Sequence, residues 1–248
     1  MSTDRWPEGY DRVVLKSVDS TNSEAMRIVS RLVRPTWILA HAQTKARGRR
    51  GRAWQNPPGN FAATLVMRPG GLPDWAALRS FLAANALYET LALFAPREKL
   101  ALKWPNDVLL DERKVAGILL ESTSCGGQID WLAIGFGVNL LHTPTPSAEA
   151  AVPPVSLREV TGEDVYPEEF LTLLAGHYAT EESILDRLGF EPIRQDWLGS
   201  AARLGEEITA RTGKHETKGL FDTIDEHGRL VLITGTGPVK IAAADVYF

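Results

Sequence analysis

The chain has 248 residues, 44% of them hydrophobic and 23% charged, which is an ordinary balance for a globular protein with one large domain or a main domain plus a small one. Its 27 lysines and arginines against 31 aspartates and glutamates give a net charge of −4, which excludes an overall basic field that would attract nucleic acid. A single cysteine excludes an internal disulfide, no apolar run is long enough to cross a membrane, and residues 1–10 do not resemble a signal peptide. We therefore expect a cytoplasmic protein.

The first quarter of the chain predicts strands around one helix. Residues Ser23–Val33 have the apolar spacing of a helix, and Thr21 with Glu24 fits a capping box at its start. The three small polar residues Ser20, Thr21 and Asn22 either cap this helix or bind an uncharged polar head group, and the local sequence does not separate the two interpretations. Three apolar runs predict strands: Arg12–Val18, Thr36–Gln43 and Asn60–Met67.

An arginine-rich loop lies between the second and third of these strands. Gly48 and Gly51 are interspersed among four arginines: Arg47, Arg49, Arg50 and Arg52. Because guanidinium groups repel one another and no apolar residue anchors them, we expect a loop that is poorly ordered until an anion binds. Glycine lets the backbone approach a ligand, and arginine offers forked donors to phosphate or carboxylate oxygens. The alternative is a solvated basic hairpin.

The middle of the chain predicts a long helix followed by a hairpin that carries polar residues. Residues Asp74–Leu93 are strongly amphipathic, and Asp74 can cap them. Three apolar runs then predict strands: Leu100–Trp104, Val108–Leu110 and Val115–Leu120. Lys103, Asn106, Asp107 and Lys114 lie among these strands, where unpaired polar groups are rarely buried. They indicate either the wall of a site, with a metal-seeking carboxylate and an ammonium group, or an exposed face with a surface ion pair.

A further strand, Trp131–Leu141, is expected to be interrupted by Gly135 and Gly137 and to end near Asn139. Two glycines within a strand indicate the close approach of a ligand or of another element. As a GxG pattern they are weak evidence for a nucleotide, because the third glycine and the following helix are missing. The five histidines have no ligand spacing, so nothing supports a zinc site.

The pattern of residues changes in the last part of the chain. Thr143–Pro154 is typical of a loop and Pro167–Leu188 of a helix. From about Gly205 short apolar runs alternate with glycines, and His227-Gly228 lies between two of them as in a hairpin. We predict a main domain of residues 1–200 and a small SH3-like β-barrel of residues 201–248.

Four segments together resemble the biotin–protein ligases, from about Val13 to the end of the sequence. The arginine loop followed by the KWPND and KVAG segment is a highly specific combination. The resemblance implies an α/β (α+β) fold with a mixed-sheet catalytic domain, like that of class II synthetases and the biotin–lipoate ligases, and a C-terminal SH3-like barrel. The segments are DSTN at Asp19–Asn22, AQTKARGRRGRAW at Ala42–Trp54, KWPNDVLLDERKVAGILLE at Lys103–Glu121 and IGFGVN at Ile134–Asn139.

The same resemblance implies an activity. The chain is expected to join biotin to ATP with Mg²⁺, giving biotinyl-5′-AMP and pyrophosphate. It would then pass the biotinyl group to a lysine of a biotin carboxyl carrier protein, as in acetyl-CoA carboxylase. The arginine loop would fold over the adenylate, counter the phosphate charge and keep water off the mixed anhydride.

Site residues also follow from the resemblance. The catalytic residues are expected to be Lys114, which would hold the biotin carboxylate, Arg49, and Asp107, which would be placed for magnesium or for the incoming lysine. The residues expected to bind biotin are Ser20, Thr21, Asn22, Gln43, Arg47, Gly48, Arg49, Lys114 and Gly117. Those expected on the ATP or adenylate side are Arg49, Arg50, Arg52, Trp54, Lys103, Asn106, Gly135 and Asn139.

The sequence departs from the usual family pattern in two places. Ala46 stands where family members usually have glycine, which bears on the flexibility of the loop. Little more than ten residues precede the first strand, so we expect the type without an N-terminal DNA-binding domain and no specific DNA binding.

A lipoate or octanoyl transferase of the same superfamily is disfavoured by the arginine loop and Lys114. A nucleic-acid-binding module is disfavoured by the acidic charge, and a homodimer stays open.

Overall fold

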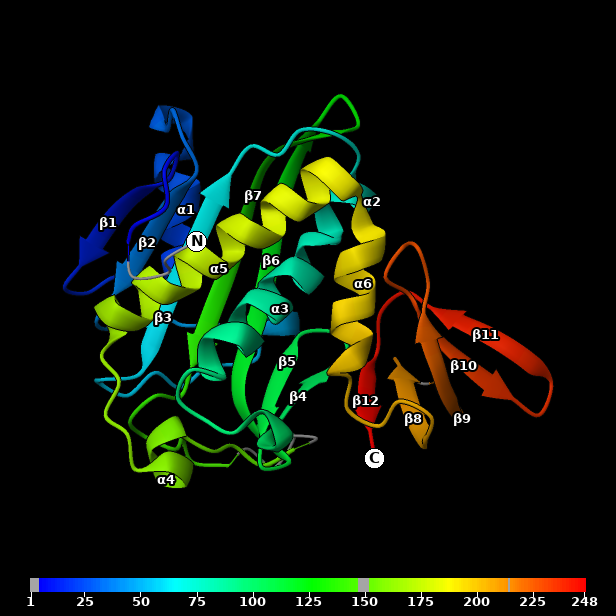
Figure 1. Cartoon of the computed structure of the whole chain (residues 1–248). Coiled ribbons are helices and arrows are strands. Elements are labelled where there is room, and N and C mark those ends of the chain that lie inside the picture. The colour runs from blue at the N-terminus through cyan, green and yellow to red at the C-terminus, as the bar shows by residue number, and fades with distance from the viewer. Residues whose placement is uncertain (1–4, 147–151, 214) are drawn as a thin grey trace.

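The structure is a computed structural model that describes residues 5–146, 152–213 and 215–248. Its strands form two sheets, one of seven strands and one of five (Figure 1). Among the described residues of the larger sheet, β1 pairs with β2 in parallel and the other neighbouring strands pair antiparallel, so the predicted mixed sheet is confirmed. In spatial order its strands are β1 (Asp11–Leu15), β2 (Thr36–Ala40), β3 (Phe61–Met67), β7 (Gln128–Val138), β6 (Arg113–Cys125), β5 (Asp107–Leu110) and β4 (Leu100–Lys103).

Helices cover both faces of this sheet near β2 and β3. Along β2, Trp37 and Leu39 belong to the main core, whereas Ile38 packs with Ala25 of the first helix, because successive side chains of a strand point to opposite faces. This double covering explains why β2 is apolar without alternation. The covering helices are α3 (Arg79–Leu91), α5 (Pro167–Leu188) and α6 (Phe190–Gly199) on one face and α1 (Thr21–Ile28) on the other.

Two of the expected elements differ from the structure. The predicted helix Asp74–Leu93 is wrong as a single helix, because the chain turns at Leu78, which ends α2 and precedes α3 and is itself buried. The predicted interruption of the glycine strand is also wrong. Gly135 and Gly137 keep their backbone hydrogen-bonding groups, so β7 pairs with β3 and β6 through both positions. The short helices are α2 (Pro73–Ala77), α4 (Leu157–Thr161) and the 3₁₀ turns η1 (Val29–Arg31), η2 (Arg49–Gly51) and η3 (Arg97–Lys99).

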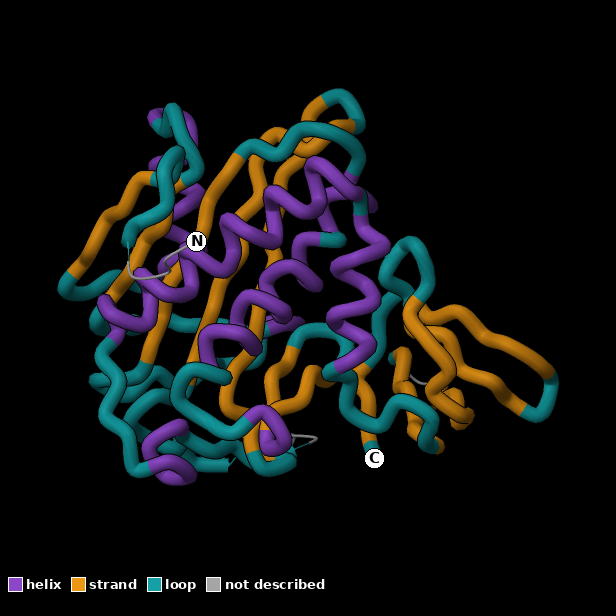
Figure 2. The backbone as a smooth tube through the Cα atoms, viewed as in Figure 1, coloured by secondary structure: helices purple, strands orange, loops and turns teal. Residues whose placement is uncertain are grey.

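Among its described residues from 201 to 248, the C-terminal part contains strands and loops but no helix (Figure 2). Its sheet is antiparallel throughout, and the predicted hairpin at His227-Gly228 joins β9 to β10. The predicted barrel is not closed, because within the described residues the outer strands β11 and β12 do not pair with each other. In spatial order the strands are β11 (Gly237–Ile241), β10 (Leu230–Thr234), β9 (His215–Ile224), β8 (Glu207–Thr212) and β12 (Asp245–Tyr247).

The smaller sheet is packed firmly against the larger one. Buried Phe221 and Leu232 belong to the same apolar cluster as the core of the seven-stranded sheet. At the turn between β9 and β10, the Gly228 carbonyl accepts a hydrogen bond of 3.1 Å from the Trp104 indole, and a Cβ on Gly228 would clash with Phe81. No helix among the described residues has both the length and the apolarity needed to cross a membrane.

Candidate ligand-binding site

A pocket of about 520 Å³ opens where the start of α1, the arginine loop, the β4–β5 turn and β12 meet over β6 and β7. This volume lies within the usual range for small-molecule sites, roughly 300–1,000 Å³. The structure therefore brings together segments that are far apart in the sequence. Arg50 and Asn139, both expected on the nucleotide side, do not line the pocket. The expected site residues that line it are Ser20, Thr21, Asn22, Gln43, Arg47, Gly48, Arg49, Arg52, Trp54, Lys103, Asn106, Asp107, Lys114, Gly117 and Gly135.

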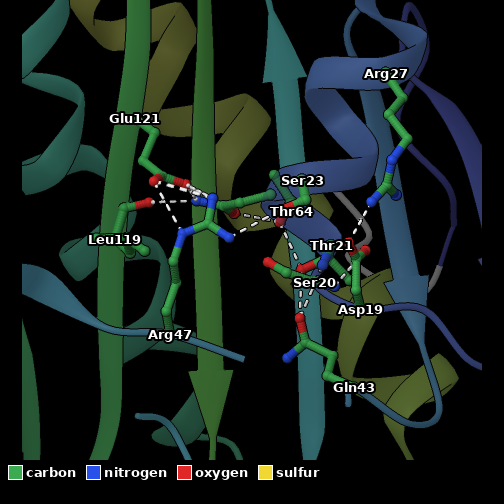
Figure 3. A network of polar contacts seen from close by, with 11 residues as sticks. Asp19, Ser20, Thr21, Ser23, Arg27, Gln43, Arg47, Thr64, Leu119 and Glu121 are labelled. Carbon is green, nitrogen blue, oxygen red and sulfur yellow. Dashed lines mark hydrogen bonds and ion pairs between the residues drawn. The ribbon is translucent and has the colours of Figure 1, made fainter. Parts of the chain in front are cut away.

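The start of α1 forms one wall of this pocket (Figure 3). Oε1 of Gln43 accepts hydrogen bonds from the Thr21 amide at 2.8 Å and from the Thr21 hydroxyl at 3.2 Å. The capping box predicted for Thr21 and Glu24 is therefore wrong. Ser20 is the N-cap residue and makes no side-chain cap bond, and a glutamine from outside the helix satisfies the amide instead. Of the two interpretations for this segment, the head-group interpretation is favoured.

Behind this wall a threonine hydroxyl serves two acceptors. Oγ1 of Thr64, on β3, lies 2.8 Å from the Thr21 hydroxyl oxygen and 2.6 Å from Oδ1 of Asn22. A hydroxyl has one proton, so it cannot donate fully to both. Ser20, Asn22 and Thr64 are buried, and the Ser20 hydroxyl makes no hydrogen bond with any described residue. The Ser20 hydroxyl is therefore a buried polar group that a ligand in the pocket can pair.

Glycines form the floor of the pocket. Gly117 on β6 and Gly137 on β7 are paired across the two strands, and the Trp54 ring lies over both. A Cβ on Gly137 would lie 2.6 Å from that ring, and a Cβ on Gly135 would clash with Oδ1 of Asn22. The close approach that the two β7 glycines predicted is therefore made by the side chains of Asn22 and Trp54.

Two lysines meet on the opposite side. Nζ of Lys114 lies 2.7 Å from Oδ1 of Asp107, without the angles of a hydrogen bond, and 5.5 Å from the Trp54 ring centroid. Lys114 thus does form an ion pair, but the Lys114 and Asp107 side chains are only 27% and 17% exposed, so it is not the surface pair of the alternative interpretation. The exposed acids of the adjoining turn, Asp111 and Glu112, pair with arginines and not with Lys114. The interpretation of these residues as a site wall is favoured.

Lys103 is more deeply buried than Lys114. Only 5% of its surface is exposed, and its ammonium group forms no ion pair or hydrogen bond with any described residue. Its Nζ faces the ring of Phe248 at 5.6 Å. Burial lowers the pKa of Lys103, the Asp107 carboxylate opposes this, and the Lys114 charge lowers it further. A buried, unpaired ammonium is costly, so this position favours an anionic ligand.

The arginine loop has partners, contrary to the expectation of a loop without anchors. Arg49 donates to Oδ1 of Asn106 at 3.1 Å, and burial lowers the pKa of Arg49. Arg50 and Arg52 both donate to Oδ2 of Asp245, on β12, at 2.6 and 2.7 Å. Burial raises the pKa of the Asp245 carboxyl, but the hydrogen bond from Arg52 and the arginine charges outweigh this and lower it. Ordering of the loop by an anion stays a prediction.

Glu121 completes the site and had no role in the sequence interpretation. Its carboxylate, near the middle of β6, accepts hydrogen bonds from Arg47 (Figure 3). It also accepts one from Nδ2 of Asn22. Glu121 lies at the end of the KVAGILLE segment, but nothing local indicates which loop and helix it contacts. The same holds for Asp245.

Asn139, expected on the nucleotide side, lies outside the lining of the pocket. Asn139 is 1% exposed, and its amide donates to the carbonyl of Val155 at 3.1 Å, so it fastens the end of β7 behind the pocket.

The described residues contain no group of three or more histidines, cysteines or acids that could hold a metal ion. The one carboxylate proposed for magnesium, Asp107, is already paired with Lys114. These donors do not fit a magnesium ion held by the protein alone.

Comparisons with known proteins agree with one another. Residues 14–139 match the Biotin/lipoate A/B protein ligase family, and residues 204–248 match the Biotin protein ligase C terminal domain. A biotin–[acetyl-CoA-carboxylase] ligase of Paracoccus denitrificans is 51% identical over 238 residues, which cover 95% of this chain and 99% of that protein. The bifunctional ligase/repressor BirA of Escherichia coli is 27% identical over 226 residues, 91% of this chain and 70% of that protein. A solved structure of the biotin protein ligase from Aquifex aeolicus in complex with biotin and ATP gives a TM-score of 0.80 at 26% identity, over 95% of this chain and 98% of that one.

Proposed function

This chain belongs to the biotin/lipoate A/B protein ligase family, and from that premise we propose that it is an ATP-dependent biotin–protein ligase. It activates biotin to biotinyl-5′-AMP and transfers the biotinyl group to a lysine of the biotin carboxyl carrier protein of acetyl-CoA carboxylase. The Paracoccus relative is named for this activity, and the Aquifex structure contains both biotin and ATP.

The wall at the start of α1 is the observation that carries the choice of biotin over lipoate. Oε1 of Gln43 and Oδ1 of Asn22 are amide acceptors at the pocket, and the Ser20 hydroxyl has no protein partner among the described residues. The ureido ring of biotin offers two N–H donors and one carbonyl, which complements such a wall. The dithiolane ring of lipoate has no N–H or carbonyl group, so it would make no hydrogen bond with Gln43 or Asn22 and would leave the buried Ser20 hydroxyl unpaired. A site built for hydrogen bonds rejects such an analogue by roughly 10⁴-fold.

The cationic side of the pocket suits the adenylation step. A carboxylate oxygen of biotin attacks the α-phosphorus of ATP, the bond to the β-phosphate oxygen breaks, and pyrophosphate leaves. Lys114 would hold the biotin carboxylate and, with Arg49 and Lys103, counter the charge that develops on the α-phosphate. Gly48 and Arg47 would cover the biotin, while Trp54, Asn106 and Arg52 border the nucleotide. In the second step the neutral amine of the acceptor lysine attacks the carbonyl carbon, and AMP leaves.

We propose that Mg²⁺ enters as part of Mg-ATP, bound chiefly by the phosphates. This leaves Asp107 to keep Lys114 in place and to face the incoming lysine. Residues 1–200 would be the catalytic domain and residues 201–248 an accessory domain that lends Asp245 and Val246 to the pocket. A cytoplasmic location and a homodimer stay predictions.

The test uses the purified protein, Mg-ATP, labelled biotin and a purified biotin carboxyl carrier protein. We expect biotin-dependent pyrophosphate release without the carrier, and label on one carrier lysine when it is added. A carrier with that lysine changed to arginine is the control. Activity with lipoate equal to that with biotin, or carrier labelling without ATP, would contradict the proposal.

A further inference from the structure

We propose that Glu121 is a positioning residue that selects for the ureido ring, by fixing which way the Asn22 amide points and by tethering Arg47. This inference rests on the proposed function for its substrate. Its structural half concerns the protein without ligand, so the two can fail separately.

One carboxylate joins three elements (Figure 3). Oε1 of Glu121 accepts from Nε and Nη2 of Arg47, both at 3.1 Å, and Oε2 accepts from Nη2 of Arg47 at 2.8 Å. Oε2 also accepts from Nδ2 of Asn22 at 2.8 Å. Nη1 of Arg47 reaches Oγ of Ser23 at 2.8 Å. The arginine loop, α1 and β6 are thereby tied at one point.

The first consequence concerns the two ends of the Asn22 amide. An ionised carboxylate only accepts hydrogen bonds, so it requires the nitrogen of Asn22 to face it. The oxygen then faces the Thr64 hydroxyl and the bare backbone of Gly135, where no side chain fits. In this orientation Asn22 presents an acceptor to the pocket. The reverse orientation would set an N–H₂ group against the ring N–H of biotin.

The second consequence concerns the start of the loop. The Glu121–Arg47 contact is a forked pair, the strong geometry for arginine and carboxylate, and both side chains are about 30% exposed. It holds Arg47, whereas the far end of the loop is held separately by Asp245. Loss of Glu121 therefore releases the biotin side of the loop and leaves the phosphate side anchored.

The key variant is Glu121→Gln, which keeps the size of the side chain but adds a donor that can pair with Oδ1 of Asn22. We expect the KM for biotin to rise about tenfold or more, with the KM for ATP within about twofold of wild type. Glu121→Asp stays acceptor-only and should give an intermediate KM, which also covers the case that the glutamine variant folds poorly. Glu89→Gln is the matched control, because Glu89 makes a similar forked pair with Arg97 on the surface, far from the pocket. It should change neither constant.

Two further measurements separate positioning from a general loss of charge. In an Asn22→Ala background, Glu121→Gln should raise the KM for biotin by clearly less than it does in the wild-type background, because only the contact with Arg47 is then left to lose. In the ligand-free protein, the ¹⁵N side-chain amide resonances of Asn22 should shift in Glu121→Gln and not in Glu89→Gln. An unchanged resonance, or the full KM effect without Asn22, overturns the inference. A wild-type protein that releases no pyrophosphate with biotin refutes the proposed function instead, and the resonance still decides the role of Glu121.

Discussion

Replacement of Lys114 by alanine tests the cationic side of the pocket. The ammonium of Lys114 is held between the Asp107 carboxylate at 2.7 Å and the Trp54 ring at 5.5 Å, above the paired glycines of β6 and β7. Its side chain is 27% exposed, so its contact with a bound carboxylate or phosphate would be largely shielded from solvent. Such a charge-assisted contact contributes about 1.5–3 kcal/mol, or about one to two decades in an equilibrium constant. An exposed ion pair contributes within about 1 kcal/mol.

We therefore expect Lys114→Ala to weaken biotin binding and slow adenylation by one to two decades. Because the remaining Asp107 charge is partly solvated, the variant should lose about 1 kcal/mol of stability, which lowers the melting temperature by about 2–4 °C. The assay is pyrophosphate release with saturating ATP across a biotin titration. Lys114→Arg should rescue only partly, because a planar fork does not replace a compact ammonium.

The matched control is Lys218→Ala. Lys218 also pairs with a carboxylate, Glu207, at 2.6 Å, but its side chain is 67% exposed on the smaller sheet. Its loss should leave the kinetics within about twofold of wild type, as expected for a surface pair. Wild-type kinetics in Lys114→Ala would remove this residue from the site and refute the reasoning about its shielded charge.

Three more expectations follow from the described contacts. Asp245→Asn should speed amide exchange of residues 49–52 in the ligand-free protein and lower the KM for ATP, because an internal competitor for Arg50 and Arg52 is weakened; unchanged exchange would contradict this. Gly137→Ala should cost about 1–3 kcal/mol in urea denaturation by displacing the Trp54 ring, whereas Gly235→Ala, which meets no atom, should be neutral. Burial raises the pKa of Glu181 to about 7, so the folded state holds this proton more tightly than the unfolded chain. Stability should therefore decline between about pH 4.5 and 7, by at most about 3 kcal/mol, and Glu181→Gln should abolish that slope; an unaltered slope would exclude this carboxyl as its source.

Local patterns predicted the elements that depend on local physics. The strand β2 and the helix α5 follow from apolar spacing, and the polar segments at Ser20–Asn22 and Lys103–Lys114 are recognisable because each is contiguous in the chain. The break at Leu78 was not predictable, because a buried leucine fits a straight helix as well as a bent one. Closure of a barrel depends on whether β11 meets β12, and neither strand encodes its neighbour.

The charge pairs that complete the pocket lie beyond the reach of local reasoning. Glu121 is 99 residues from Asn22 and 74 from Arg47, and Asp245 is 195 residues from Arg50. An acidic side chain on a strand usually faces water, so its sequence context does not name a partner. The β7 glycines are an intermediate case, because they predicted a close approach without saying that Asn22 and Trp54 make it.

The ring of Trp54 over bare backbone gives the protein an optical probe of its own. Of its seven tryptophans, four are almost fully buried: Trp37, Trp104, Trp131 and Trp197. Trp54 is half-buried, borders the pocket and faces an ammonium group at 5.5 Å, so its excited state senses both charge and solvent there. When an adenylate binds and the loop closes, the environment of the Trp54 indole would change, whereas that of the four buried indoles would not. Emission from the unlabelled protein can therefore follow loop closure in a stopped-flow mixing experiment, with a Trp54→Phe variant identifying the part of the signal that belongs to the site.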